Sequence, residues 1–275
     1  MDEPPEQAAP PREQRLVFGE VANAYDRRRP SYPKQLIEAV LDYSGLADDT
    51  ATPVLEVGAG TGKASTLFAA HGIRLTCLEP SPAMASLARR NLTGFNNVDV
   101  LQTSFEDWRP TPHSYGLLLA AQSWHWMSPE MRTTKAHQAL RPLGTIALFW
   151  NVIANRGGEG LDRDLTTAYG DLMPNGMWRS VPTDRVQANN WVIEELEGSG
   201  LFGPVTVLRE PWHATYGSDE WLELLSTQSD HRMLDEEDRA ALFERIRTAV
   251  DANGGTVDVD YLTVGYLART KRTQP

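Results

Sequence analysis

Val54-Leu-Glu-Val-Gly-Ala-Gly-Thr-Gly-Lys63 is a short apolar segment that leads without interruption into three alternating glycines. An apolar run bounded by glycines is typical of a strand buried in a parallel sheet. Glycine has no Cβ, so the chain can turn sharply after the strand and a ligand can approach its backbone closely. The stretch therefore predicts a strand, a cofactor-binding loop and a helix in succession.

Two acidic residues accompany this loop. Glu56 stands two residues before the first glycine, and Glu79 ends the next expected strand, 17 positions beyond Gly62 (79 − 62). A carboxylate at the end of that second strand is placed to accept hydrogen bonds from a ribose. The glycines alternate with single residues, whereas dinucleotide enzymes favour G-x-G-x-x-G. The pattern is thus E-x-G-x-G-x-G with a distant acid.

This pattern closely resembles that of the class I S-adenosylmethionine-dependent methyltransferases. Two further stretches, Tyr25–Pro33 and Ala120–Met127, resemble the small-molecule branch that contains trans-aconitate methyltransferases and bacterial natural-product methyltransferases. The resemblance is specific from about Phe18 to Asn151. It implies an α/β fold with a doubly wound, seven-stranded, mostly parallel sheet whose last strand is antiparallel. The alternative is a tight strand–helix turn that binds no ligand.

The resemblance also implies which residues surround S-adenosylmethionine. Glu79 would accept hydrogen bonds from both ribose hydroxyls, and Glu56 would orient the amino end of the methionine part, directly or through water. Phe105 would also lie beside the ribose and adenine, and the alternative for this residue is ordinary packing beneath the sheet. The remaining implied cofactor-binding residues are Gly58, Ala59, Gly60, Gly62, Pro80, Ser81, Met84, Ser104, Glu106, Ala121 and Gln122.

Strands and helices alternate between Pro53 and Asn151, which predicts a parallel sheet with helices on both faces. The expected strands are Pro53–Val57, Arg74–Leu78, Val98–Gln102, Gly116–Ala120 and Gly144–Trp150, with helices at Lys63–His71, Pro82–Leu92 and Pro129–Leu140. Later elements are helices Trp191–Ser199, Asp219–Ser226 and Glu236–Ala252 and strands Val205–Trp212 and Thr256–Ala268.

The expected organisation is one domain over residues 16–275. Residues 1–15 are rich in proline and charge, which predicts a disordered tail. Residues 16–45 are expected to form lid helices, with Lys34–Ser44 as the second of them. Residues 152–190 and 213–252 are expected to be cap insertions over the site.

Methyl transfer depends first on alignment, because the positive sulfur of the cofactor already makes its methyl carbon electrophilic. Positioning can supply about 7–11 kcal/mol of a barrier. A base is needed only where the acceptor must lose a proton. His125 is the first candidate base, since it follows the fourth expected strand and a histidine titrates near neutral pH. Its alternative is packing between Trp124 and Trp126 to orient the loop.

Tyr25 is the second catalytic candidate, because the family's N-terminal helix folds over the cofactor as a lid. It could donate a hydrogen bond to the methionine carboxylate or to the acceptor. Arg29 could pair with the same carboxylate through a charge-assisted contact. The alternative for the run Arg27–Arg29 is the solvated end of a helix.

The methyl acceptor is expected to bind in a pocket lined by aromatic side chains. Trp124, Trp126, Trp150 and Trp178 follow strands or lie in the expected insertion, and such walls favour flat or apolar acceptors. A small aromatic, indole-type natural product methylated on carbon, nitrogen or oxygen fits, unless these tryptophans belong to the core.

A carboxylate acceptor is a second possibility, which the trans-aconitate resemblance implies. It needs no base but requires cations in the pocket, which Arg156, Arg163 and Arg179 could supply. The glycine loop is also compatible with an RNA or protein methyltransferase and with a cofactor-binding protein that performs no catalysis.

Composition restricts the partners. The 275 residues carry a formal net charge of −11, which disfavours nucleic acid as a partner. Six scattered histidines and a single cysteine, Cys77, predict no metal site and no intramolecular disulfide. The chain shows no signal segment and no long apolar run, so we expect a cytoplasmic protein without membrane contact, acting on a small molecule as monomer or homodimer.

Overall fold

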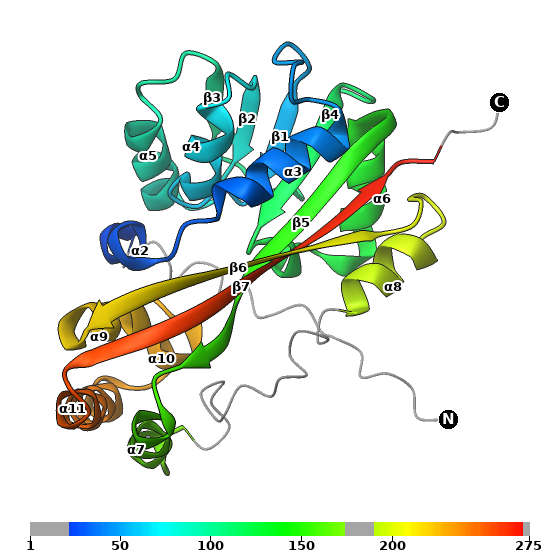
Figure 1. The fold of residues 1–275 in the computed structure, drawn as a ribbon. Helices are drawn as coiled ribbons and strands as arrows, with labels where there is room; N and C mark the ends of the chain where they lie inside the picture. The colour runs from blue at the N-terminus through cyan, green and yellow to red at the C-terminus, as the bar shows by residue number, and fades with distance from the viewer. Residues whose placement is uncertain (1–21, 174–189, 272–275) are drawn as a thin grey trace.

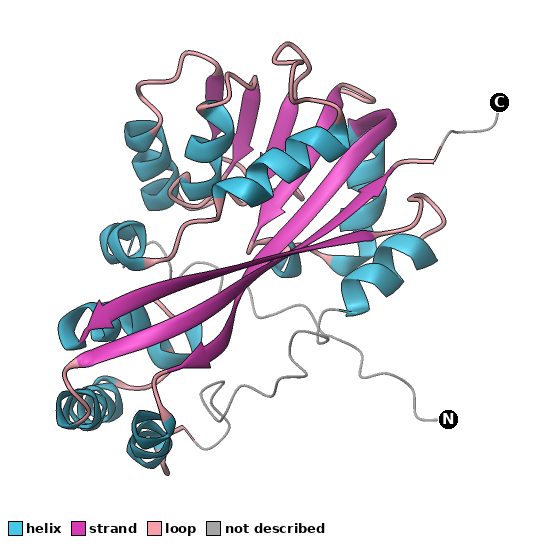
Figure 2. Ribbon diagram, viewed as in Figure 1, coloured by secondary structure: helices cyan, strands magenta, loops and turns pink. Residues whose placement is uncertain are grey.

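The computed structural model describes residues 22–173 and 190–271, and the strands within them form one sheet (Figures 1 and 2). The strand order is β3-β2-β1-β4-β5-β7-β6. Strands β1 to β5 are mutually parallel, and β7 runs antiparallel between β5 and β6. The elements are β1 (Val54–Val57), β2 (Leu75–Leu78), β3 (Val98–Leu101), β4 (Tyr115–Ala121), β5 (Leu140–Arg156), β6 (Thr206–Gly217) and β7 (Thr256–Arg269). The predicted seven-stranded, mostly parallel sheet is confirmed.

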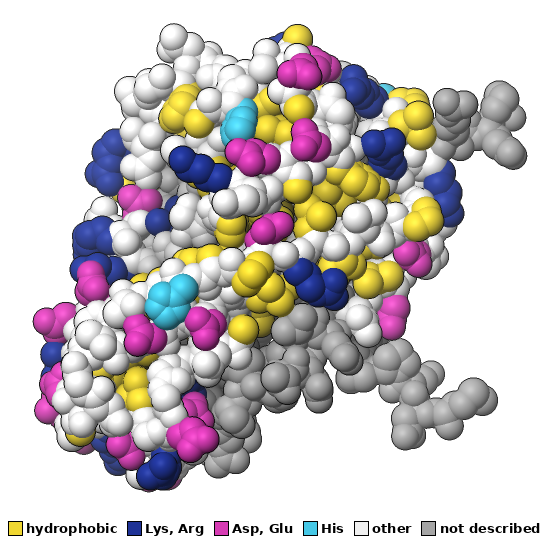
Figure 3. Space-filling view, in the orientation of Figure 1, with side chains coloured by type: hydrophobic (Ala, Val, Ile, Leu, Met, Phe, Trp, Pro, Cys, Tyr) yellow, Lys and Arg dark blue, Asp and Glu magenta, His cyan; other side chains and the backbone are white. Residues whose placement is uncertain are grey.

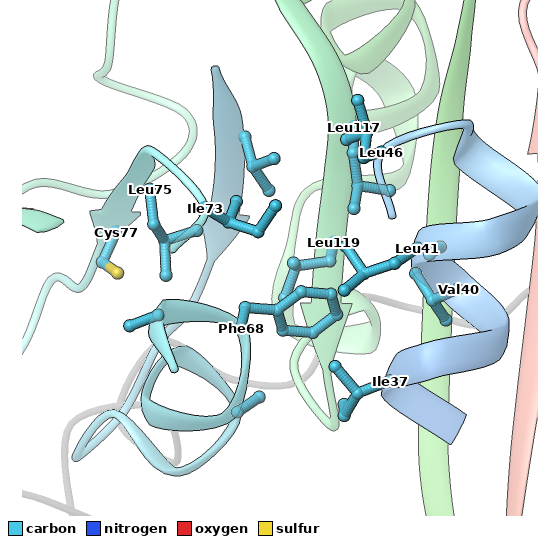
Figure 4. Close-up of a cluster of buried hydrophobic side chains, with 14 of the residues drawn as sticks. Ile37, Val40, Leu41, Leu46, Phe68, Ile73, Leu75, Cys77, Leu117 and Leu119 are labelled. Carbon is cyan, nitrogen blue, oxygen red and sulfur yellow. The ribbon is translucent and has the colours of Figure 1, made fainter. Parts of the chain in front are cut away.

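Helices cover both faces of the parallel part (Figure 1). Helices α3 (Lys34–Ser44), α4 (Lys63–Ala69) and α5 (Pro82–Asn91) lie on one face, and α6 (Pro129–Ala139) and α8 (Asn190–Gly198) on the other. The apolar side chains of α3 recur at helical spacing and are buried against Phe68 and Leu117 (Figure 4). Strand β1 is buried along its whole length, which explains its unbroken apolar sequence.

The three strands β5, β7 and β6 continue well past the end of β4 and carry a second layer of helices (Figure 1). This distal layer consists of α7 (Glu159–Tyr169), α9 (Ser218–Ser226), α10 (Ser229–Arg232) and α11 (Glu236–Ala252). Its helices pack on the strand extensions around Leu165, Trp221, Ile246 and Val259, a hydrophobic cluster distinct from those of the parallel part.

The distal layer corrects the sequence interpretation of the segment after Trp150. The expected irregular insertion begins instead as a continuation of β5, in which Val152 pairs with Leu262 and Ile153 with Tyr261. Helix α7 then follows a glycine pair, and Gly157 has a positive φ of 56°. Strand β6 likewise extends to Gly217, beyond the predicted end at Trp212. The predicted tail, residues 1–15, lies outside the described residues.

Helix α2 (Ala22–Arg28) lies between the parallel part and the distal layer. Ala22 and Tyr25 pack against Met84 and Leu87 of α5. On its other side, α2 contacts α9 through its arginines. Within residues 22–173 and 190–271, no helix is long and apolar enough to cross a membrane.

Candidate active site

The loop after β1 presents its backbone rather than side chains. Gly58, Gly60 and Gly62 have φ values of 69°, 59° and 88°, a region that L side chains rarely adopt. A Cβ at Gly58 would lie 2.6 Å from Cβ of Ser123, so the loop and the end of β4 are in close contact there. A Cβ at Gly60 would meet only the Tyr25 ring, at 4.0 Å. The backbone at Gly60 is therefore open to a ligand beneath Tyr25.

Glu79 follows β2 and fixes this loop. Its side chain is buried, with Oε2 accepting a hydrogen bond from the Gly60 N–H at 2.8 Å and Oε1 one from the Ser81 N–H at 2.8 Å. Each carboxylate oxygen accepts more than one hydrogen bond. The carboxylate thus stands beside the open loop, held there by two backbone N–H groups.

Glu56 lies beneath the loop, inside the core. Only 1% of it is exposed, and its Oε2 accepts hydrogen bonds from Ser65 Oγ at 2.5 Å and Cys77 Sγ at 3.9 Å. Burial raises its pKa to about 8, although these two hydrogen bonds oppose the shift. Glu56 is therefore protonated at neutral pH in this state.

Tyr25 of α2 and Arg29, which directly follows this helix, lie together, and the Arg29 N–H donates to the Tyr25 carbonyl at 2.9 Å. The Arg29 guanidinium carbon is 5.1 Å from the Tyr25 ring centroid. Burial raises the pKa of the Tyr25 phenol, and the charge of Glu79 adds to this while Arg29 opposes it. At neutral pH the phenol keeps its proton and acts as a hydrogen-bond donor.

Tyr32 belongs to the same group, although no sequence motif singled it out. Burial raises the pKa of its phenol well above the usual value, the charges of Tyr25 and Glu56 add to this, and the charge of Arg29 opposes it. Its ring meets Phe149 edge-on, with centroids 4.9 Å apart. The only sequence feature that could have indicated Tyr32 was its place, as an aromatic residue, within the stretch Tyr25–Pro33.

The chain turns abruptly after β4, at the expected methionine end of the site. Ala121 ends the strand, and Gln122 has a positive φ of 55°, a conformation that is strained for a residue with a Cβ. The Gln122 N–H donates to the Phe149 carbonyl at 2.9 Å, and the Ser123 hydroxyl donates to the Val57 carbonyl. The carboxyl ends of β1 and β4 are thereby joined to each other and to the middle of β5.

His125 lies in the short 3₁₀ helix η2 (Trp124–Trp126) and is half-buried. Its Nδ1 lies 3.2 Å from Nε1 of Trp150. Burial lowers the pKa of its imidazole to about 4, and the charge of Arg132 acts in the same direction. The ring is therefore neutral at physiological pH.

The tryptophans are mostly core residues, which corrects the predicted substrate wall. Trp124 is fully buried, donates from Nε1 to Glu195 at 3.3 Å and lies beneath the Arg132 guanidinium. Trp150 is 8% exposed and packs edge-on against Trp191. These side chains fill the space between the sheet and α8. Trp126 is half-buried beside His125, with ring centroids 4.8 Å apart. Trp178 lies outside the described residues.

The residues predicted near the adenine divide into two groups. Pro80 and Met84 flank Glu79 at the start of α5, and Met84 contacts the lid helix. Phe105 is 2% exposed and packs between Trp108 and Trp124, so the packing alternative describes its position in this structure. In the neighbouring turn, Ser104 bonds Asp107, and Glu106 accepts from the Ser128 N–H at 3.0 Å.

The arginines proposed for a carboxylate acceptor are not gathered. Arg156 is 4% exposed at the far end of β5 and lies 3.4 Å from Asp162, whereas Arg163 is exposed on α7. Arg179 lies outside the described residues. Among residues 22–173 and 190–271, no group of three or more His, Cys, Asp or Glu side chains could hold a metal ion.

Comparisons with known proteins agree with this geometry. Residues 54–144 match a family whose description is methyltransferase domain. An uncharacterized methyltransferase of Mycobacterium tuberculosis is 35% identical over 147 residues, which make up 54% of this chain and 57% of that protein. The chain therefore matches little more than half the length of this relative.

Solved structures share the fold. A protein from Anaeromyxobacter dehalogenans described as a type II methyltransferase superposes with a TM-score of 0.58 at 20% identity, covering 88% of this chain and 97% of that one. Phosphoethanolamine N-methyltransferase 2 of Haemonchus contortus, in complex with phosphomonomethylethanolamine and S-adenosylhomocysteine, gives 0.53 at 12% identity, covering 92% and 58%. Residues 54–144 thus match a methyltransferase domain, and the fold over most of the chain is the one that these two methyltransferase structures share.

Proposed function

We propose that this protein transfers the methyl group of S-adenosylmethionine to a nitrogen or oxygen atom of a small-molecule acceptor. The observation that carries the proposal is the pairing of the open glycine loop with Glu79, whose carboxylate is held beside Gly60 by a 2.8 Å hydrogen bond. A ribose needs such an acceptor, and a glycine-rich loop permits close approach of a ligand to the backbone. The same fold binds S-adenosylhomocysteine in the Haemonchus contortus enzyme.

The residues around the loop have separate roles in this proposal. Glu79 binds the ribose hydroxyls, with the loop backbone against the cofactor and Pro80 and Met84 at its adenosine side. Tyr25 and Arg29 cover the methionine part, and Ala121 and Gln122 border it from the end of β4. When bound, S-adenosylmethionine supplies an electrophilic methyl carbon, so the protein contributes chiefly alignment.

The preference for nitrogen or oxygen rests on the protonation of the two candidate bases. His125 accepts at Nδ1 from an indole N–H and has its proton at Nε2, and Tyr25 retains its phenolic proton. Both groups therefore donate hydrogen bonds at neutral pH. Methylation of a ring carbon would need a base to remove the ring proton, whereas an amine or a phenolate is already nucleophilic. His125 is then an orienting donor rather than a base.

A carboxylate acceptor and an RNA substrate have less support. A carboxylate acceptor would need pocket cations, and Arg156 lies instead at the far end of β5, ion-paired with Asp162. An RNA substrate would need a basic surface. The face shown in Figure 3 carries acidic and basic side chains interspersed, and the chain has a net charge of −11.

The test has two arms. Calorimetry should detect binding of S-adenosylmethionine and S-adenosylhomocysteine, and absence of binding at millimolar concentration would contradict the proposal. Incubation with methyl-labelled S-adenosylmethionine and matched phenol, aniline and indole acceptors, followed by mass spectrometry, should locate the label on oxygen or nitrogen. Label on a ring carbon or on a carboxylate would contradict the acceptor assignment.

A further inference from the structure

Arg29 is held by a residue almost two hundred positions away. Its Nε donates to the hydroxyl of Thr227 at 2.9 Å, and its Nη2 donates to the backbone carbonyl of Thr227 at 2.8 Å. Two parallel N–H groups on one edge of a planar guanidinium fix both its position and its orientation. Thr227 therefore determines how Arg29 lies.

Thr227 is well suited to this contact. It directly follows α9 and is completely buried. Its hydroxyl donates its only proton to the Leu224 carbonyl at 2.6 Å, so the oxygen's lone pairs are left to accept from Arg29. The backbone carbonyls at the carboxyl end of a helix carry partial negative charge, which favours a cation there.

The guanidinium keeps donors for a ligand. Within the described residues, the Arg29 side chain forms hydrogen bonds only with Thr227, through Nε and Nη2. An arginine has five N–H donors, so those at Nη1 are left over. The guanidinium lies over the Tyr25 ring, and this ring is 4.0 Å from the position that a Cβ on Gly60 would take.

Neighbouring charges do not replace this contact. Arg27 and Arg28 pair with Glu223 and, for Arg28, also with Glu220, which docks α2 on α9 at the surface. Exposed pairs of this kind contribute about 0–1 kcal/mol each. The pKa of Asp230 is lowered against the effect of burial, chiefly by the hydrogen bond of its Oδ1 with His231 at 2.8 Å, and the charge of Arg29 adds to this.

We propose that Thr227 is a positioning residue: it orients Arg29 so that the remaining guanidinium donors bind the carboxylate of the methionine part of the cofactor. Helix α9 of the distal layer thereby completes a cofactor site that otherwise belongs to the parallel part and the lid. This inference rests on the proposed function, since it assigns a ligand to the same loop.

The test separates the carboxylate from the rest of the cofactor. S-adenosylhomocysteine carries the amino-acid part, whereas 5′-methylthioadenosine retains the adenosine and thioether without it. Thr227→Val keeps the shape but removes the hydroxyl. We expect S-adenosylhomocysteine to bind about 10- to 100-fold more weakly, as the loss of a hydrogen bond to a charged group implies. Methylthioadenosine should bind to Thr227→Val as it does to the wild type, and Thr227→Ser should bind both ligands with wild-type affinity.

Binding of the same two ligands to further variants supplies the controls and the results that would contradict the proposal. Thr248→Val is a matched control, because Thr248 also bonds a helix carbonyl, that of Glu244 at 3.0 Å, but on the exposed face of α11. Arg29→Gln should reproduce the selective loss, and adding Thr227→Val to it should cost nothing more. Equal weakening of both ligands, or of neither, would overturn the proposal. Failure of the wild type to bind S-adenosylhomocysteine would instead overturn the proposed function, and this inference with it.

Discussion

The indole N–H of Trp150 donates a hydrogen bond to Nδ1 of His125, with 3.2 Å between the two nitrogens. An indole nitrogen only donates, so the imidazole accepts at Nδ1 and carries its proton at Nε2. Since burial lowers the imidazole pKa to about 4, this arrangement persists across the physiological range. Trp150, a residue predicted to line the acceptor pocket, instead sets the tautomer of the predicted base.

The dependence of kcat on pH should therefore show no titration of a histidine. We expect kcat of the wild type to show no change assignable to His125 between pH 6 and 8, because the group is neutral throughout that range. His125→Asn should lower kcat by about 10-fold through lost alignment, without altering the shape of the profile. An acidic limb near pH 6.5 that disappears in His125→Asn would show that His125 acts as a base.

The same histidine should affect stability at acid pH. Its folded pKa is below the value of 6.5 in the unfolded chain, so the unfolded state binds more protons between about pH 4 and 6.5. The free energy of unfolding should therefore fall as the pH is lowered through this window. His125→Asn should reduce that fall, which urea unfolding at pH 5 and pH 7.5 would measure. An equal pH dependence in both proteins would argue against a buried neutral imidazole.

Glu79→Gln should weaken S-adenosylhomocysteine binding by at least about 10-fold, since hydrogen bonds to a charged group contribute about 1.5–3 kcal/mol. The amide also places an NH₂ group against the N–H of Gly60 or Ser81. Calorimetry would give the affinity, and thermal unfolding would report how much of the loss reflects a disturbed loop. Glu38→Gln, on the exposed surface of α3, is the matched control. Unchanged affinity in Glu79→Gln would contradict the proposal that Glu79 binds the ribose hydroxyls.

The sequence predicted the parallel part well because its signals are local. Apolar runs ending in glycine located β1, and the acid at the end of β2 lies beside Gly60 as the motif implies. Two helices of the distal layer, Asp219–Ser226 and Glu236–Ala252, were also predicted. The strand extensions were missed because they are stabilised by pairing between β5 and β7, more than one hundred residues apart, as between Ile153 and Tyr261. Nothing in the local composition after Trp150 records that pairing.

The candidate site divides in the same way. Residues within one motif, such as Tyr25 and Arg29, were predicted together and lie together. The contact of Arg29 with Thr227 joins segments 198 positions apart, so no spacing rule could find it. Trp124 shows the opposite error: its place after β4 predicted a pocket wall, but side-chain packing beneath the sheet buries it completely.

Gly58→Ala should destabilise the protein by about 1–2 kcal/mol or more, because an L residue at a φ of 69° pays the left-handed penalty and its Cβ would lie 2.6 Å from that of Ser123. Gly94→Ala is the control, since a Cβ there meets nothing within 4 Å. Chemical denaturation of both variants would measure the difference. Equal stability would mean that the loop and the end of β4 move apart readily.

Glu56 gives a prediction that links the buried core to the cofactor. Its pKa of about 8 leaves it protonated at pH 7 in the free protein, whereas the unfolded chain is ionised there. Because the folded pKa is raised, the free energy of unfolding should decrease as the pH rises from about 4.5 to 8. Glu56→Gln should abolish this decrease, which urea unfolding across that pH range would measure.

Binding of the cofactor should release that proton. S-adenosylmethionine brings an ammonium and a sulfonium charge, and nearby positive charge favours the ionised form of a carboxyl group. Calorimetry at pH 7 in buffers of different ionisation enthalpy should reveal proton release by the wild type and none by Glu56→Gln. S-adenosylhomocysteine, which lacks the sulfonium charge, should release less. If the binding enthalpy of the wild type were the same in all buffers, no proton would be released. The cationic groups of the cofactor would then lie away from Glu56, and Glu56 would not belong to the binding site.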